Sequence, residues 1–235
     1  MAEEMKMEDF PGNDSKYHLE NVEALADSPY KGKRICFLGS SVTLGARSMD
    51  VSFADYISKR LGCSYVKEAV NGTTLADVDD ESYISRMKRN ISKDEKFDCF
   101  VCQLSTNDAA RGLDIGKVSD SKDIDSFDTK TIAGAIEYII AYAKETYHCP
   151  VVFYTGSFFE SELYSQMIEL IVAIRDKWGI LLADLWHDDE MGELIRNDKE
   201  SYDLYMADPV HPTQAGYLVW WLPKIEPVIK RALDQ

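Results

Sequence analysis

The sequence has far fewer basic residues than acidic residues. Over 235 residues, 26 Lys and Arg stand against 41 Asp and Glu, which gives a formal net charge of −15. A field of that sign repels DNA, RNA and anionic lipid, so we expect no nucleic-acid partner and no membrane partner. No apolar run approaches the length of about 18 residues that a membrane-spanning helix needs.

Cysteine is scarce as well. Five cysteines are an odd and low number for this length, which fits reduced thiols better than a disulfide framework. The first residues, MAEEMKMEDFPGNDSK, are acidic and lack the apolar segment of a secretory signal. We therefore expect a soluble, cytoplasmic protein.

Apolar residues are numerous enough for one large core. They make up 45% of the chain, and 235 residues are generous for one domain and short for two. Residues 1–32 are polar and weakly periodic, so we interpret them as an N-terminal extension. We expect residues 33–235 to form a single domain.

Short apolar runs alternate with longer amphipathic stretches. The runs at residues 34–39, 97–104 and 150–156 are continuously apolar, as strands covered on both faces are. Residues 65–70 and 180–184 are weaker candidates of the same kind.

Helical patterns lie between these runs, at residues 51–61, 129–147, 160–178 and 222–233. Alternation of strands and helices predicts parallel strands joined by right-handed crossovers, and hence an α/β three-layer sandwich with a central parallel sheet. Such sheets carry their working residues in the loops at the carboxyl ends of the strands. We therefore look for a site in those loops.

Small polar residues follow the first predicted strand, in the run Gly39-Ser40-Ser41-Val42. This run lacks the lysine of a Walker loop, the glycines of the dinucleotide fingerprint and the second glycine of the G-x-S-x-G elbow. What remains is a tight turn that presents a serine hydroxyl at the edge of the sheet. Ordinary turn chemistry produces the same pattern.

Three further polar segments matter: N-G-T-T at 71–74, S-T-N-D at 105–108 and D-P-V-H-P at 208–212. Asn-Gly also makes tight turns and Asn-Asp also caps helices, so the first two have structural interpretations. In the third, His211 has Asp208 three residues before it and a proline on either side. Such a rigid loop suits a base whose ring is held in one orientation by a carboxylate.

Together the four segments resemble the motifs of the SGNH (GDSL-type) esterase and lipase family, over residues 33–233. The resemblance implies a flavodoxin-like SGNH hydrolase fold. It implies that Ser41 is the nucleophile and that Asp208 and His211 complete a catalytic triad. It also implies an oxyanion hole formed by the backbone N–H groups of Ser41 and Gly72 and the side-chain amide of Asn107.

The chain departs from the family pattern beside these residues. Ser40 and Val42 replace the aspartate and leucine of G-D-S-L. Ser105 stands where the glycine of G-x-N-D is usual, and Ala69 where an earlier glycine of the second motif is often found. None of the four reacting residue types is lost.

The residues allow a serine-esterase mechanism that requires neither a metal nor an organic cofactor. His211 would take the proton of Ser41, Asp208 would orient the ring, and the three donors would stabilise the oxyanion. We expect a small or carbohydrate-linked carboxylic ester as substrate, such as an O-acetyl group. A longer-chain lipase, a thioesterase and a non-catalytic binding module on the same fold are alternatives.

Other candidate sites have structural interpretations. Cys99 and Cys102 lie within one predicted strand and point to opposite faces, which indicates buried core thiols and no redox pair. The remaining histidines lack zinc-ligand spacing, and the acidic run at 77–81 has no EF-hand pattern, so we expect no metal site.

Two groups of aromatic residues lie near the predicted site. Tyr154 and Phe158 follow the fourth strand and are candidates for the wall of the acyl or alcohol pocket. Tyr217, Trp220 and Trp221 follow the histidine segment at near-helical spacing. The sequence does not decide whether this second group belongs to the core or to the pocket.

Overall fold

The computed structural model describes residues 6–235, and the first five residues of the predicted extension lie outside it. The described part of the extension contains four short 3-10 turns: Met7–Asp9, Pro11–Asn13, Ser15–Tyr17 and Leu19–Asn21. The division into an extension up to residue 32 and a domain from residue 33 stays a prediction.

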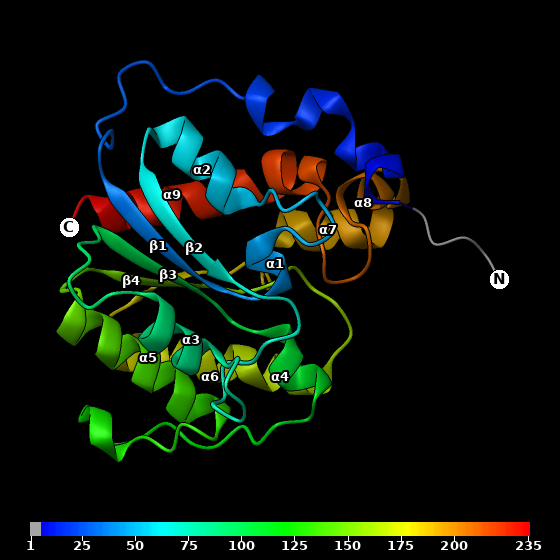
Figure 1. Cartoon of the computed structure of the whole chain (residues 1–235). Helices are drawn as coiled ribbons and strands as arrows, with labels where there is room; N and C mark the ends of the chain where they lie inside the picture. The colour runs from blue at the N-terminus through cyan, green and yellow to red at the C-terminus, as the bar shows by residue number, and fades with distance from the viewer. Residues whose placement is uncertain (1–5) are drawn as a thin grey trace.

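A parallel sheet of five strands forms the centre of the molecule (Figure 1). Its strands are β1 (Arg34–Gly39), β2 (Ser64–Ala69), β3 (Cys99–Gln103), β4 (Val151–Tyr154) and β5 (Leu181–Ala183). They lie in the order β2-β1-β3-β4-β5, and each neighbouring pair is parallel. This is the strand order of flavodoxin-like sheets, and the predicted α/β three-layer class is confirmed.

Helices cover both faces of the sheet (Figure 1). On one face lie α3 (Tyr83–Asn90), α5 (Ile132–Thr146) and α6 (Glu162–Trp178). On the other lie α2 (Phe53–Leu61) and α9 (Leu222–Leu233). The predicted helical patterns correspond to α2, α5, α6 and α9, whereas the sequence did not predict α3.

Alternation along the strands divides the apolar side chains between two cores. In β1, Cys36 and Leu38 join the core under α3, α5 and α6, and Ile35 and Phe37 join the core under α2 and α9. Side chains of a strand point to opposite faces in turn, so a strand buried on both faces is apolar throughout.

Local signals set the helix ends. In α2, Ser52 and Asp55 form a reciprocal capping box. Thr131 and Ser161 cap α5 and α6, and Gly179 ends α6 with a φ of 61°.

The remaining elements are short. α1 (Ser41–Leu44) and α4 (Thr106–Ala110) follow β1 and β3, and α7 (Asp189–Asn197) and α8 (Lys199–Tyr205) follow β5. A 3-10 turn spans Ile124–Ser126, and a π-helical segment, Gly216–Trp221, leads into α9. Across residues 6–235, no helix combines the length and apolarity needed to cross a bilayer.

Candidate active site

The candidate site lies where the chain leaves β1 and β3 in opposite directions. From β1 the chain continues to α2 on one face, and from β3 to α5 on the other (Figure 1). Such a point leaves a crevice at the carboxyl edge of the sheet, which is where open α/β sheets bind ligands. Ser41 is the first residue of α1 and Asn107 lies in α4, so both flank this crevice.

Ser41, His211 and Asp208 form a continuous chain of hydrogen bonds. The Nε2 atom of His211 lies 2.8 Å from Oγ of Ser41, and its Nδ1 lies 2.8 Å from each carboxylate oxygen of Asp208. With the ring proton on Nδ1, the imidazole donates to Asp208 and Nε2 accepts the Ser41 hydroxyl. The serine itself is only 7% exposed.

The loop that carries the histidine is fixed by its own carboxylate. Oδ1 of Asp208 accepts the backbone N–H groups of Val210 and His211, both at 2.9 Å. Burial raises the pKa of Asp208, but the hydrogen bonds from His211 and these N–H groups outweigh it, so the pKa lies below its ordinary value. Nε of Arg47 lies 3.7 Å from the same carboxylate.

The turn after β1 is held from behind by Gln103. Its Oε1 accepts the backbone N–H groups of Ser40 and Thr43 and the hydroxyl of Thr43. A Cβ atom at Gly39 would lie 1.7 Å from the Thr43 hydroxyl oxygen, so this close turn requires glycine. Tyr217 donates its hydroxyl to the carbonyl of Val42 and supports α1 from the core.

The three predicted oxyanion donors lie on separate elements. The backbone N–H groups of Ser41 and Gly72 have no hydrogen-bond partner within residues 6–235. Gly72 has a φ of 74°, a conformation that favours glycine. Nδ2 of Asn107 donates one hydrogen to the carbonyl of Thr73 at 2.9 Å, and its second hydrogen stays available. The N-cap of α4 is Ser105, so Asn107 does not cap the helix.

Arg86, which sequence reasoning missed, connects two of these loops. Its fully buried guanidinium donates to the carbonyl of Gly39, to the hydroxyl of Thr73 and to the carboxylate of Glu68. Asp108 fixes the same region, since its carboxylate accepts the backbone N–H groups of residues 75 and 76. Burial raises the pKa of Asp108, although these hydrogen bonds oppose the shift.

The predicted pocket aromatics separate into buried and exposed residues. Tyr154 is 1% exposed and its hydroxyl is paired with Thr43, so its position does not support the predicted place in a pocket wall. Phe158 is 45% exposed at the carboxyl edge. Tyr217, Trp220 and Trp221 are buried in the core beside α2 and α9.

The cysteine pair and the acidic run that the sequence analysis considered lie in the core and at the start of a helix. Cys102 lies in the core under α5 and Cys99 in the core under α9, on opposite faces of β3. In the acidic run, Asp77 accepts the hydroxyls of Ser82 and Ser85 at the start of α3.

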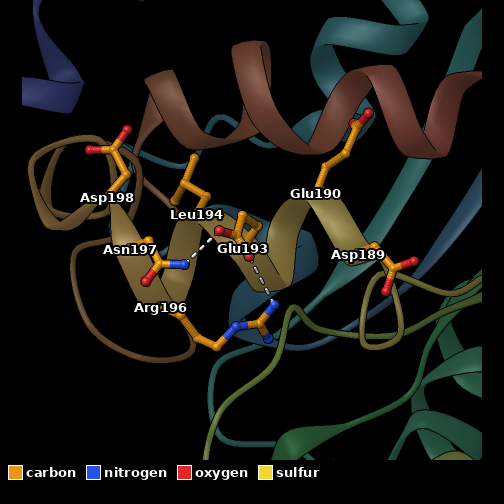
Figure 2. Close-up of a pocket in the computed structure, with 7 residues that line it drawn as sticks. All are labelled: Asp189, Glu190, Glu193, Leu194, Arg196, Asn197 and Asp198. Carbon is orange, nitrogen blue, oxygen red and sulfur yellow. Dashed lines mark hydrogen bonds and ion pairs between the residues drawn. The ribbon is translucent and has the colours of Figure 1, made fainter.

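A cavity of about 710 Å³ lies along α7 (Figure 2). Its walls are Asp189, Glu190, Glu193, Leu194, Arg196, Asn197 and Asp198, which include none of the predicted site residues. Figure 2 shows that two of them, Arg196 and Asn197, pair with Glu193 on the same helix.

Solved structures of similar fold include a protein from Lactobacillus plantarum (19% identity, 87% of this chain and 97% of that chain, TM-score 0.67). Another is described as a GDSL-like lipase from Bacteroides ovatus (18%, 86% and 97%, TM-score 0.61). A third is a catalytic mutant of an acetylxylan esterase from Geobacillus stearothermophilus (14%, 89% and 97%, TM-score 0.59). No curated protein matches the chain significantly.

These likenesses show the fold, which is the SGNH hydrolase fold. Residues 37–219, most of the chain, match the GDSL-like lipase/acylhydrolase family. The chain therefore belongs to that family and is a carboxylic-ester hydrolase.

Proposed function

We propose that this chain is a serine esterase that hydrolyses a small or carbohydrate-linked ester, such as an O-acetyl group, through an acyl-enzyme. The observation that carries the proposal is the chain of 2.8 Å contacts from Ser41 through His211 to Asp208 at the crevice between β1 and β3. A serine hydroxyl is a poor nucleophile without a base in hydrogen-bond contact, and this geometry supplies one.

In the first step, Ser41 Oγ attacks the ester carbonyl carbon while His211 Nε2 takes the hydroxyl proton. The ionised Asp208 stabilises the imidazolium that forms. The carbonyl oxygen becomes an oxyanion and accepts hydrogen bonds from Ser41 N, Gly72 N and Asn107 Nδ2. His211 then protonates the leaving alcohol as the carbon–oxygen bond breaks.

Hydrolysis of the acyl-enzyme repeats these steps with water as nucleophile. His211 takes a proton from the water, the hydroxide oxygen bonds to the acyl carbon, and the proton returns to Ser41 as the carboxylic acid leaves. The residues named here require neither a metal ion nor an organic cofactor.

The short acyl group is supported by a structural relative that is an acetylxylan esterase. Exposed large apolar side chains are scattered over distant elements, among them Leu25, Tyr65, Val78 and Phe158. A long acyl chain gains up to about 0.8 kcal/mol for each buried CH₂ only where a continuous apolar wall receives it. We therefore propose acetyl or butyryl esters over octanoyl esters.

Labelling with a fluorophosphonate tests the nucleophile, because this probe reacts with an activated serine. We expect labelling of the wild-type protein and none of Ser41→Ala, with Ser40→Ala as the matched control that still reacts. A well-folded wild-type protein that is not labelled would indicate a binding module and contradict the proposal.

A panel of acetyl, butyryl and octanoyl esters and acetylated sugars then tests the substrate, and a rise in kcat/KM to octanoyl would favour a lipase.

A further inference from the structure

A second cavity, of about 360 Å³, lies at the carboxyl end of β5. Its lining combines Phe158 from the loop after β4, Trp186 and His187 from the loop after β5, and Ile195 and Arg196 from α7. This volume falls within the range of about 300–1,000 Å³ that is usual for small-molecule sites. Nothing in the mechanism above uses these residues.

The aromatic wall of this cavity is rigid and partly open. The ring of Phe158 is 45% exposed and lies 4.9 Å from that of Trp186, centroid to centroid. Trp186 also packs against Phe159 and against the buried Tyr164, at 5.4 and 5.3 Å. Tyr164 in turn donates its hydroxyl to the carbonyl of Leu104. The exposed ring therefore rests on side chains that are fixed by the core.

The polar wall offers an oriented hydrogen-bonding group. Nδ1 of His187 lies 2.8 Å from the carboxylate of Asp184, which fixes the ring. Its side chain is 53% exposed, and Nε2 has no partner among residues 6–235. Arg196 reaches the same cavity from α7, where it is paired with Glu193 (Figure 2). An imidazole and a guanidinium beside an exposed ring can hydrogen-bond hydroxyl groups while the ring contacts an apolar sugar face.

The cavity shares an edge with the candidate active site. Ser41 follows β1, and Trp186 and His187 follow β5, which is three strand positions away in the order β1-β3-β4-β5. Neighbouring strands are about 4.8 Å apart, so the two sites are separated by about 14 Å along the edge. A chain of a few sugar units spans such a distance, whereas an acetylated monosaccharide does not.

We infer that this cavity, formed by Phe158, Trp186, His187 and Arg196, is a subsite for a neutral sugar of an oligosaccharide whose acetyl group lies at Ser41. The inference rests on the proposed function and adds that the substrate is an extended glycan. A neutral glycan suits the net charge of −15, which disfavours anionic substrates.

An acyl chain is the competing occupant, and the lining opposes it. The exposed Asp189 also lines the cavity, whereas the carboxylate of Asp188 is already paired with Lys224 and the backbone N–H of Met191. An acyl chain seated there would displace water from the Asp189 carboxylate without giving it hydrogen bonds, which is costly. Sugar hydroxyls donate hydrogen bonds to such oxygens.

Comparing two substrates distinguishes an effect on sugar binding in the cavity from an effect on ester hydrolysis itself. One is an acetylated xylo-oligosaccharide, and the other is 4-nitrophenyl acetate, which is too small to reach the cavity. We expect Phe158→Ala and His187→Ala each to lower the ratio of kcat/KM for the oligosaccharide to that for 4-nitrophenyl acetate by about three- to tenfold. Leu25→Ala, another exposed apolar truncation, should leave the ratio unchanged.

Binding without turnover gives a second readout. We expect unacetylated xylohexaose to bind Ser41→Ala in a calorimetric titration, and the affinity to fall three- to tenfold when Phe158→Ala is added. An unchanged ratio and unchanged affinity in folded Phe158→Ala and His187→Ala proteins would overturn the inference. A selective loss of octanoyl ester hydrolysis would overturn it in favour of an acyl groove.

Failure of the proposed function has a different signature. If the wild-type protein binds xylohexaose through Phe158 but neither hydrolyses 4-nitrophenyl acetate nor reacts with the fluorophosphonate, the subsite stands and the esterase proposal fails. If hydrolysis and labelling occur and neither variant affects the glycan, the esterase proposal stands and the subsite fails.

Discussion

Asn107 has two amide hydrogens, and the fold uses one of them. The hydrogen bond to the carbonyl of Thr73 orients the amide, and the other hydrogen has no partner within residues 6–235. Because Ser105 supplies the cap of α4, the structure leaves Asn107 without the role of an N-cap. A role as a hydrogen-bond donor to the oxyanion therefore explains this side chain better than a role as the cap of α4.

We expect Asn107→Ala to lower kcat by about 10²–10³ with little change in KM, because the lost hydrogen bond strengthens mainly in the transition state. The loss of the bond to Thr73 should lower the melting temperature slightly. Asn90→Ala, at the exposed end of α3, serves as the control. A kcat that stays at the wild-type value would remove Asn107 from the site.

The ionisation of Asp208 contributes to the stability of the fold. Its pKa is lower in the folded protein than its ordinary value, because the hydrogen bonds from His211 and the backbone outweigh burial. Such a group stabilises the fold above its unfolded-state pKa, about 3.9, and this stabilisation is lost as pH falls through the folded-state pKa. Asp208 is thus ionised at neutral pH.

We expect Asp208→Asn to lower kcat by about 10⁴, since asparagine leaves the histidine in the wrong tautomer. We also expect its melting temperature to lie below that of the wild type at pH 6. The difference should begin to shrink below about pH 4 and disappear only below the folded-state pKa. An esterase assay measures kcat, and thermal melts across this pH range measure stability, with the exposed Asp120→Asn as control in both. A difference that grew towards acid pH would contradict the sign of the pKa shift.

At the scale of elements, the sequence predicts helices and strands that have a periodic apolar pattern. It does not predict features that depend on contacts between residues far apart in the chain. All five strands and the helices α2, α5, α6 and α9 could be found, because apolar periodicity and caps are local signals. Helices α3, α7 and α8 were missed: they have seven to nine residues, and few positions of α7 and α8 are buried. The site motifs could be placed at strand ends, but the burial of Tyr154 depends on a distant partner, Thr43.

No pattern in the neighbouring sequence indicates the role of Arg86. It lies on a short helix, yet it ties the end of β1, before the proposed nucleophile, to the loop of Thr73, beside the proposed oxyanion donor Gly72. A buried guanidinium left with fewer partners is destabilising by several kcal/mol, so these loops are held by a strong constraint. We interpret Arg86 as a positioning residue.

We expect Arg86→Lys to lower kcat by about 10–10² while KM changes little, because lysine lacks the planar fork that binds Gly39 and Thr73 together. Arg89→Lys, on the exposed side of the same helix, is the matched control. Thr73→Val is the milder variant if Arg86→Lys does not fold, since it removes one acceptor and keeps the charge. Full kcat in either folded variant would show that Arg86 acts on stability alone.

The N-terminal segment is a second bracing element. Asn13 is 2% exposed, donates to the carbonyl of Arg47 and accepts the backbone N–H of Gln214. Arg47 lies beside Asp208, and Gln214 lies three residues after His211. The segment therefore connects the loop after α1 to the loop that carries His211.

We expect Asn13→Ala to cost about 1–3 kcal/mol, because it leaves the buried N–H of Gln214 without a partner. For a chain of this size each kcal/mol lowers the melting temperature by about 2–4 °C. Asn21→Ala, whose hydrogen bond is exposed, should change it little. Equal melting temperatures for the two variants would show that the segment does not brace the domain.

At the scale of the whole molecule, the two cores enclose nearly every thiol. Cys36, Cys99, Cys102 and Cys149 are buried, and Cys63 is the most exposed of the five. Burial raises the pKa of all of them, to about 11 for Cys63 and Cys149 and well above the ordinary value for the other three. The reactive form of a thiol is the thiolate, so the fold itself keeps these groups inert.

The cysteines therefore report on opening of the entire structure. At pH 8 a thiol with a pKa of about 11 is ionised in about one molecule in a thousand, against about a quarter for a free cysteine. We expect a colorimetric disulfide reagent to modify the native protein at least about 10²-fold more slowly than free cysteine, and to titrate all five thiols in denaturant. Cys63→Ser should remove any reaction that precedes unfolding, because the other four react only when the layers separate. Rapid native modification that survives Cys63→Ser would mean that one of the two cores opens independently of the other.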